Sequence, residues 1–176
     1  ITAGDYDGDG KTDVACADNL GRLWLFAGRG TGEFDLPVMA TDGFKPGSFL
    51  QAVDWNLLTS IDWDGDGRDE ILGQFSILDL KTYISHEPLT VYRLKENWKL
   101  ESWLAVSIHQ VRAFARADLD GDGSEEAILS AADPTELNLY SRPSLYIWDS
   151  GSDSGRIRGP FSTVAAPTSI AVHQTQ

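Results

Sequence analysis

The feature that most constrains this chain is a nine-residue pattern that occurs three times at almost constant spacing. Each copy has aspartate at positions 1, 3 and 5, glycine at positions 4 and 6, and an acid at position 9. The copies cover residues 5–13, 62–70 and 118–126, so they begin 57 and 56 residues apart. A fixed period of this length predicts three copies of one supersecondary unit.

Runs of apolar, β-branched and aromatic residues surround each copy, as is typical of β-strands bounded by turn residues. One run precedes the pattern, a second begins at its last residue, and a third and a fourth follow. These runs are 57–61 and 111–117; then 13–17, 70–75 and 126–131; then 22–26, 89–94 and 144–148; and finally 34–40, 98–106 and 156–161. Within them, the segment 94–104 is also compatible with a helix. We therefore predict about four antiparallel strands per unit.

The predicted fold class is all-β, with three β-propeller blades of four antiparallel strands each. We expect one repeat domain over residues 1–176, with blades at about 1–50, 51–107 and 108–161, and with 162–176 as the start of a further blade or a closing strand. Helical solenoids do not fit the strand pattern, and an immunoglobulin-like sandwich would not explain the threefold period. Propellers have about four to eight blades, so we expect additional blades or self-association to complete this one.

Negative charge is concentrated in the three nine-residue patterns. The formal net charge is −13, and the patterns hold 14 of the 27 acids but only two of the 14 bases. Outside them, 13 acids face 12 bases, so the remaining surface is nearly neutral. Nucleic acid is not an expected partner because phosphate binding needs a basic surface. A membrane span is not expected either, since no apolar run reaches about 18 residues.

The carboxylates of each pattern are predicted to bind one Ca²⁺, giving three ions in total. The glycines permit positive φ, so the chain can curl and bring like charges together, which a cation then stabilises. Calcium takes six to eight oxygen ligands in irregular geometry. The backbone carbonyl of position 7 is the expected additional ligand. The predicted metal-binding residues are Asp5, Asp7, Asp9, Lys11 and Asp13; Asp62, Asp64, Asp66, Arg68 and Glu70; and Asp118, Asp120, Asp122, Ser124 and Glu126.

Other readings of the pattern fit less well. An EF-hand requires glutamate at position 12 and flanking helices, but position 12 is Cys16, Gly73 or Leu129 and strands are predicted on both sides. Zinc and copper prefer His or Cys ligands, which the patterns lack. Magnesium is the second choice because it demands a stricter octahedron. Asp-Gly pairs also form simple hairpin turns, although such turns do not require acids at positions 1, 3, 5 and 9.

The pattern Asp-x-Asp-Gly-Asp-Gly-x-x-Asp/Glu resembles the calcium loop of FG-GAP repeats, the blades of integrin α-subunit-type propellers, and of the related bacterial VCBS repeats. Residues 25–34 also resemble the strand and Gly-x-Gly-x-Phe turn of bacterial members. The resemblance implies a loop between the first two strands of each blade. It also implies an extracellular, adhesive or enzyme-appended scaffold, and it supplies no catalytic residue.

The predicted function is therefore a calcium-stabilised extracellular binding or adhesion module, secreted or at the cell surface, whose partner is a protein or a glycan. A lectin is one alternative, since six tryptophans are many for this length. We expect Trp24 and Trp148 to pack inside blades. A structural role is also expected for Trp63, which lies at position 2 of a loop as Tyr6 and Leu119 do, so Trp55, Trp98 and Trp103 remain for a sugar. An enzyme is not expected, because no histidine has a partner at motif spacing. The histidines are His86, His109 and His173. A non-catalytic propeller within a secreted enzyme is the remaining alternative.

Overall fold

The computed structural model describes residues 1–18, 21–41, 50–79, 89–106, 108, 111–131, 144–150 and 156–161. These residues form twelve strands and one single-turn 3-10 helix, η1 (Glu96–Trp98). The strands are β1 (Thr2–Gly4), β2 (Asp13–Ala17), β3 (Leu23–Phe26), β4 (Val38–Met39), β5 (Leu50–Ile61), β6 (Glu70–Asp79), β7 (Leu89–Lys95), β8 (Lys99–Val106), β9 (Ala113–Ala117), β10 (Glu126–Ala131), β11 (Ser144–Asp149) and β12 (Arg156–Phe161). The all-β prediction is confirmed.

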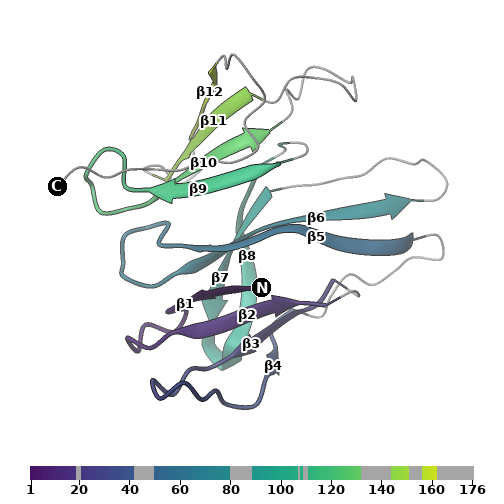
Figure 1. The fold of residues 1–176 in the computed structure, drawn as a ribbon, viewed down its shortest axis with the longest axis vertical. Helices are drawn as coiled ribbons and strands as arrows, with labels where there is room; N and C mark the ends of the chain where they lie inside the picture. Colours follow the sequence, from purple (N-terminus) through teal and green to yellow (C-terminus); the bar gives the residue numbers. More distant parts are fainter. Residues whose placement is uncertain are drawn as a thin grey trace. The chain divides into compact units, whose positions relative to one another are not determined.

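The strands form three four-stranded sheets, and within each sheet every strand pairs with the next one along the chain (Figure 1). The sheets are β1–β4, β5–β8 and β9–β12, and all their pairings are antiparallel. Such an up-and-down sheet is the unit from which a β-propeller blade is made. The prediction of four antiparallel strands per repeat is confirmed.

Side chains alternate between the two faces of each strand, as the pleat requires. In β3, Leu23 and Leu25 are buried, whereas Trp24 on the opposite face is half-buried. The indole Nε1 of Trp24 donates a hydrogen bond to Asp18 at 3.0 Å. Trp24 is therefore half-buried and hydrogen-bonded, whereas Trp148 is almost completely buried, so the prediction that both pack fully inside a blade holds only for Trp148.

The segment 94–104, which was ambiguous in sequence, is a β-hairpin. The end of β7 pairs with the start of β8, with Lys95 opposite Lys99, and η1 makes the turn between them. Asn97 and Trp98 both have positive φ, 64° and 60°. The chain reverses direction at this turn, which a continuous helix could not do. Residues with helical propensity, such as Glu96, therefore lie in a turn here and not in an α-helix.

The chain divides into two compact units, residues 1–61 with 67–106 and residues 62–66 with 107–176. In the first unit, a buried cluster joins the sheets β1–β4 and β5–β8, and partly buried side chains pack against it. The cluster contains Tyr6, Ala15, Leu25, Ala40 and Ile71, with Leu58, Tyr92, Leu94, Trp98 and Leu100 against it. In the second unit, Trp63 meets Trp148 edge to face, with ring centroids 4.6 Å apart. An aromatic residue from position 2 of a loop therefore takes part in the core of each unit: Tyr6 in the first and Trp63 in the second.

Several sequence predictions concern residues outside the described ranges. The further blade or closing strand expected at 162–176 is one, and the three histidines are another. Trp55 lies in β5, but its side chain is likewise outside the description. A transmembrane helix is not found in the part of the chain that the structure describes.

Candidate metal centres

The three acidic loops join the first and second strands of the three sheets: β1 to β2, β5 to β6, and β9 to β10. All are flanked by strands, unlike the loop of an EF-hand. The glycines at positions 4 and 6 have φ between 70° and 97° in every loop. Side chains other than glycine rarely adopt this conformation, so these glycines allow each loop to curl and turn its aspartates inward.

Asp5, at position 1, holds the first loop in its curled form. Its Oδ1 accepts hydrogen bonds from the backbone N–H of Gly8 at 2.9 Å and of Asp9 at 3.1 Å. Its Oδ2 accepts from the N–H of Gly10 at 2.8 Å. A single carboxylate thus accepts hydrogen bonds from three successive backbone N–H groups of the loop. Aspartate side chains commonly bond to nearby backbone in this way in turns.

Asp13, at position 9, is the first residue of β2 and is only 1% exposed. Its carboxylate accepts hydrogen bonds from the N–H of Tyr6 at 3.1 Å and of Gly28 at 2.8 Å. Burial raises the pKa of Asp13, the two N–H donors oppose that rise, and the nearby charges of Asp7 and Asp9 add to it. A carboxylate that is buried and close to other negative charges is stabilised in its ionised form by a neighbouring cation.

Three carboxylates of the first loop converge. Asp5, Asp7 and Asp13 each offer an oxygen, and these oxygens all lie within 4.8 Å of one another. Asp9 is not in this group, and its carboxylate pairs with the Lys11 ammonium instead. Hydrogen bonding from Lys11 lowers the pKa of Asp9. The structure thus brings together three of the four predicted acids of this loop.

The third loop repeats the curl of the first, although its converging carboxylates are those of positions 1, 3 and 5 rather than 1, 3 and 9. Asp118 accepts hydrogen bonds from the N–H of Gly121 at 2.7 Å and of Gly123 at 3.2 Å. The carboxylates of Asp118, Asp120 and Asp122 offer oxygens within 4.8 Å of one another. The curled form of the first loop is therefore a property of the repeated sequence.

Glu126, at position 9 of the third loop, is fully buried. It accepts a hydrogen bond from the N–H of Leu119 at 2.7 Å and one from the Ser150 hydroxyl at 3.4 Å. Burial raises its pKa, and the negative charges of Asp120, Asp149 and Asp122 raise it further. Glu126 thus corresponds to Asp13 of the first loop in place, burial and electrostatics.

Asp149 joins the third centre, and reasoning from the sequence missed it. Asp120, Glu126 and Asp149 form a second group with oxygens within 4.8 Å of one another. Asp149 ends β11, outside the nine-residue pattern. It lies next to Glu126 because Ala127 pairs with Trp148 in the sheet. Only the register of the third strand could have revealed this neighbour.

The second loop differs at position 9. Asp62, Asp64 and Asp66 offer oxygens within 4.8 Å of one another, as in the third loop. Glu70 is buried, and its Oε1 lies 3.4 Å from the Nε of Arg93. The register that places Asp149 beside Glu126 places Arg93 beside Glu70, since Ile71 pairs with Tyr92. A guanidinium therefore already balances the position-9 charge of this loop.

Position 7 is occupied by Lys11, Arg68 and Ser124, whose carbonyl groups were predicted as ligands. The backbone N–H groups of Lys11 and Ser124 donate to the position-5 carboxylates Asp9 and Asp122, at 2.9 Å and 2.8 Å. These bonds fix the backbone of position 7 within the curl. Metal ligation by its carbonyl oxygen stays a prediction.

The donor set suits a hard divalent cation. Every residue in the four groups found among the described residues is Asp or Glu. Carboxylate oxygens at this density match the ligand preference of Ca²⁺, and also of Mg²⁺ where an octahedron can form. The residues present therefore fit the ion expected from the sequence.

Three up-and-down four-stranded sheets, each with an acidic loop between its first two strands, define a repeat protein made of propeller-type blades. Residues 5–73 match the family model described as an FG-GAP-like repeat, so the part of the chain from the first acidic loop into β6 is similar to that family. This match confirms the FG-GAP resemblance, while the relation to VCBS repeats stays a prediction. A comparison with curated proteins finds no match.

Proposed function

We propose that the chain is a calcium-stabilised β-propeller-type scaffold that acts as an extracellular binding or adhesion module, with one Ca²⁺ in each acidic loop. The observation that carries the proposal is the convergence of three aspartate oxygens within 4.8 Å in the equivalent loop of every sheet. Three equivalent sites suit a structural ion, because catalysis seldom needs one site per repeat. We therefore propose no catalytic residue.

Calcium would stabilise the folded state through the free energy of its binding. An ion that binds the curled loop but not the unfolded chain stabilises the folded state in proportion to the logarithm of its concentration above the dissociation constant. Extracellular calcium modules have dissociation constants of about 10⁻⁴–10⁻³ M, so millimolar calcium outside the cell would occupy the loops. This requirement agrees with a secreted or cell-surface location.

The proposal is tested by calorimetric unfolding of the chain in EDTA and in 5 mM calcium, a concentration on the order of tenfold above that dissociation constant. We expect the unfolding temperature to rise by several degrees in calcium and less in magnesium. A triple variant, D7N/D64N/D120N, removes one converging carboxylate from each loop and should lose most of the shift. Identical unfolding curves for the wild type with and without calcium would refute the role of the ion.

A matched control uses acids outside the loops. Glu33 and Asp35 are exposed and pair with Arg29, and no group of converging carboxylates includes them. The variant E33Q/D35N also lowers the negative charge and should keep the calcium shift. If it lost the shift as well, general charge screening would explain the effect of calcium.

The partner of the scaffold is proposed to be an extracellular protein. The tryptophans considered for sugar stacking are engaged where their side chains are described. Trp98 packs against the core cluster of the first unit, and the Arg93 guanidinium lies 3.6 Å from the centre of the Trp103 ring. These contacts do not favour a lectin. A glycan array with wild-type protein would detect one, and a positive signal lost in W103A would replace the protein-binding proposal.

A further inference from the structure

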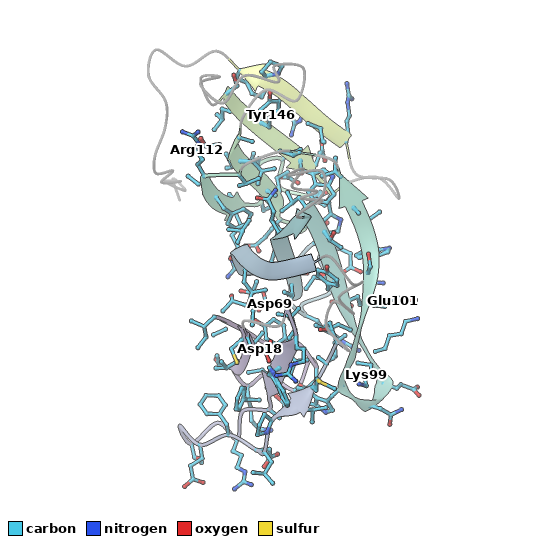
Figure 2. The ribbon with its side chains drawn as sticks, turned by 90° about the vertical axis from the view of Figure 1, so that its right-hand side faces the viewer. Asp18, Asp69, Lys99, Glu101, Arg112 and Tyr146 are labelled. Carbon is cyan, nitrogen blue, oxygen red and sulfur yellow. The ribbon has the colours of Figure 1, made fainter. Side chains whose placement is uncertain are left out.

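Asp69 links the second acidic loop to the start of the first. It occupies position 8 of its own loop and is labelled in Figure 2. Its Oδ2 accepts a hydrogen bond from the backbone N–H of Asp5 at 2.9 Å, and its own N–H donates to the Asp5 carbonyl oxygen at 2.8 Å. These two bonds join residues 64 positions apart, both within the first unit.

The same pair of bonds occurs in the second unit. The N–H of Asp62, at position 1, donates to the Glu125 carboxylate at 3.0 Å, and the Glu125 N–H donates to the Asp62 carbonyl oxygen at 2.8 Å. Glu125 is position 8 of the third loop. The contact therefore runs each time from position 8 of one loop to position 1 of the loop before it.

Close packing accompanies both contacts. A Cβ built on Gly4, just before the first loop, would lie 2.6 Å from the Asp69 carboxylate. A Cβ on Gly8 would lie 2.9 Å from the Arg68 side chain, and one on Gly65 would lie 2.9 Å from the Gly123 carbonyl oxygen. Position 4 of one loop thus lies against position 6 or 7 of the next, so neighbouring loops dock side by side in a repeated manner.

We propose that the acid at position 8, Asp69 or Glu125, is a positioning residue that orients the first calcium ligand of the preceding loop. The inference rests on the proposed function, because it concerns the same sites. Neither residue belongs to a group of converging carboxylates. Each carboxylate instead accepts from a backbone amide of the loop before its own, and that of Glu125 also lies 3.2 Å from the Arg116 guanidinium.

The physical basis lies in Asp5. Its carboxylate must accept three N–H bonds of its own loop and also face the ion. The direction of that carboxylate follows from the backbone of Asp5, which Asp69 holds from both sides. A hydrogen bond from an amide to a charged acceptor is stronger than a neutral one. Loss of the Asp69 carboxylate should therefore loosen the first site without removing a ligand from it.

The test isolates the first site in the otherwise complete chain. The background variant D64N/D120N weakens the second and third loops, and D69N or D69A is added to it. Terbium, a luminescent substitute for calcium, is titrated with excitation of tyrosine, because Tyr6 lies inside the first loop at position 2. We expect D69A to weaken terbium binding at this site by roughly tenfold. D69N keeps an oxygen acceptor for the Asp5 N–H, so it should lose clearly less.

The matched control is Thr12, which occupies position 8 of the first loop and makes no hydrogen bond to another loop in the described part of the chain. T12A should leave the affinity unchanged. The pair D69N and D69A also separates the hydrogen bond from simple charge, since both remove the negative charge and only D69A removes the acceptor. Equal effects of the two variants, or no effect of either, would overturn the positioning role.

A second measurement separates this inference from the proposed function. Hydrogen exchange of the Asp5 amide, followed by NMR in EDTA, should quicken in D69A and much less in D69N. If the wild type takes up neither calcium nor terbium, the proposed function fails, and exchange still decides whether Asp69 holds Asp5. If the wild type binds calcium and D69A changes neither affinity nor exchange, the positioning role fails alone. Should D69A not fold, E125A and E125Q ask the same question at Asp62, with R116Q as the control for the Arg116–Glu125 ion pair.

Discussion

At the scale of single residues, the acids at position 9 differ from the other acids of the pattern. Asp13 and Glu126 are buried at the start of a strand, whereas Asp7 and Asp120 lie further out in the loops. The sequence predicted these side chains as ligands but not their raised pKa values, because burial depends on the sheet that forms around them. Without a metal, a buried carboxylate beside other carboxylates opposes folding at neutral pH.

This leads to a prediction for the metal-free protein. Because the folded-state pKa of Glu126 is raised above its ordinary value of 4.5, its contribution to stability is full below that value and is lost as the pH rises through the folded pKa. In EDTA at pH 7, E126Q should therefore unfold at a higher temperature than the wild type. The difference should shrink near pH 4, where the wild-type group is protonated. Glutamine keeps an oxygen for the Leu119 N–H.

In calcium, the wild type should instead unfold at a higher temperature than E126Q, because glutamine is a poorer calcium ligand than a carboxylate. Thermal unfolding at both pH values, with and without calcium, tests both parts. E33Q serves as the control, since Glu33 is an exposed acid with a side chain 73% accessible. If E126Q were destabilising in EDTA at pH 7 by as much as in calcium, the electrostatic account of Glu126 would be wrong.

At the scale of strands and loops, local signals predicted most elements. β2, β10 and β12 begin and end where the runs of apolar residues do, and β3, β7 and β11 differ by one residue at one end. The strand limits that the sequence did not predict are those set by pairing with another strand. β5 begins at Leu50, well before the predicted run, because it pairs with β6 as far as Asp79 through two irregularities in register. Pairing partners, which are not encoded locally, set those limits.

The same non-local register decides the charge beside the position-9 acid of each loop. One residue beyond the last pair of each ladder, position 9 faces a neutral residue in the first sheet, arginine in the second and aspartate in the third: Ala27, Arg93 and Asp149. We expect the third loop to bind calcium most tightly and the second least, since a nearby opposite or like charge changes the energy of a bound ion by about 1 kcal/mol or more. Calorimetric titration should resolve this order.

Two substitutions examine the cause of that order. D149N should weaken the tightest site by roughly tenfold, and R93Q should strengthen the weakest by a similar factor. K95Q is the control for R93Q, because Lys95 is a cation of the same strand that pairs with Glu101 on β8, away from the loop. Figure 2 labels Glu101, together with Lys99 at the start of β8. An equal response to K95Q would attribute the order to overall charge.

At the scale of the whole molecule, the two units repeat one packing relation. The residue at position 2 of a loop packs against the sheet of the following repeat: Tyr6 with Ile71 in the first unit, and Trp63 with Trp148 in the second. Tyr6 and Trp63 are almost completely buried, whereas Leu119, the third member of the series, is 43% exposed. The sequence predicted a structural role for position 2, but the exposure of Leu119 follows only from its place in the last described repeat.

The neighbourhood of Leu119 agrees with this difference. A Cβ built on Gly121 meets no described atom within 4 Å, although the equivalent glycines, Gly8 and Gly65, touch the next loop. Leu119 and Gly121 therefore present the surface that a following repeat covers in the other two cases. If the additional blades or the self-association predicted from the sequence exist, we expect this surface to be covered by them.

The contrast between Trp63 and Leu119 gives the last prediction. W63A removes a buried indole and leaves a cavity, so it should lower the free energy of unfolding by about 3–5 kcal/mol. L119A removes a side chain that water already reaches, so its cost should stay below about 1 kcal/mol. Urea unfolding of both variants measures these values, and sedimentation velocity gives the assembly state of the same samples. A large cost for L119A, found together with a mass above that of one chain, would mean that a second copy covers Leu119 in solution. A small cost in a monomer would mean that water reaches this side chain in solution as it does in the structure.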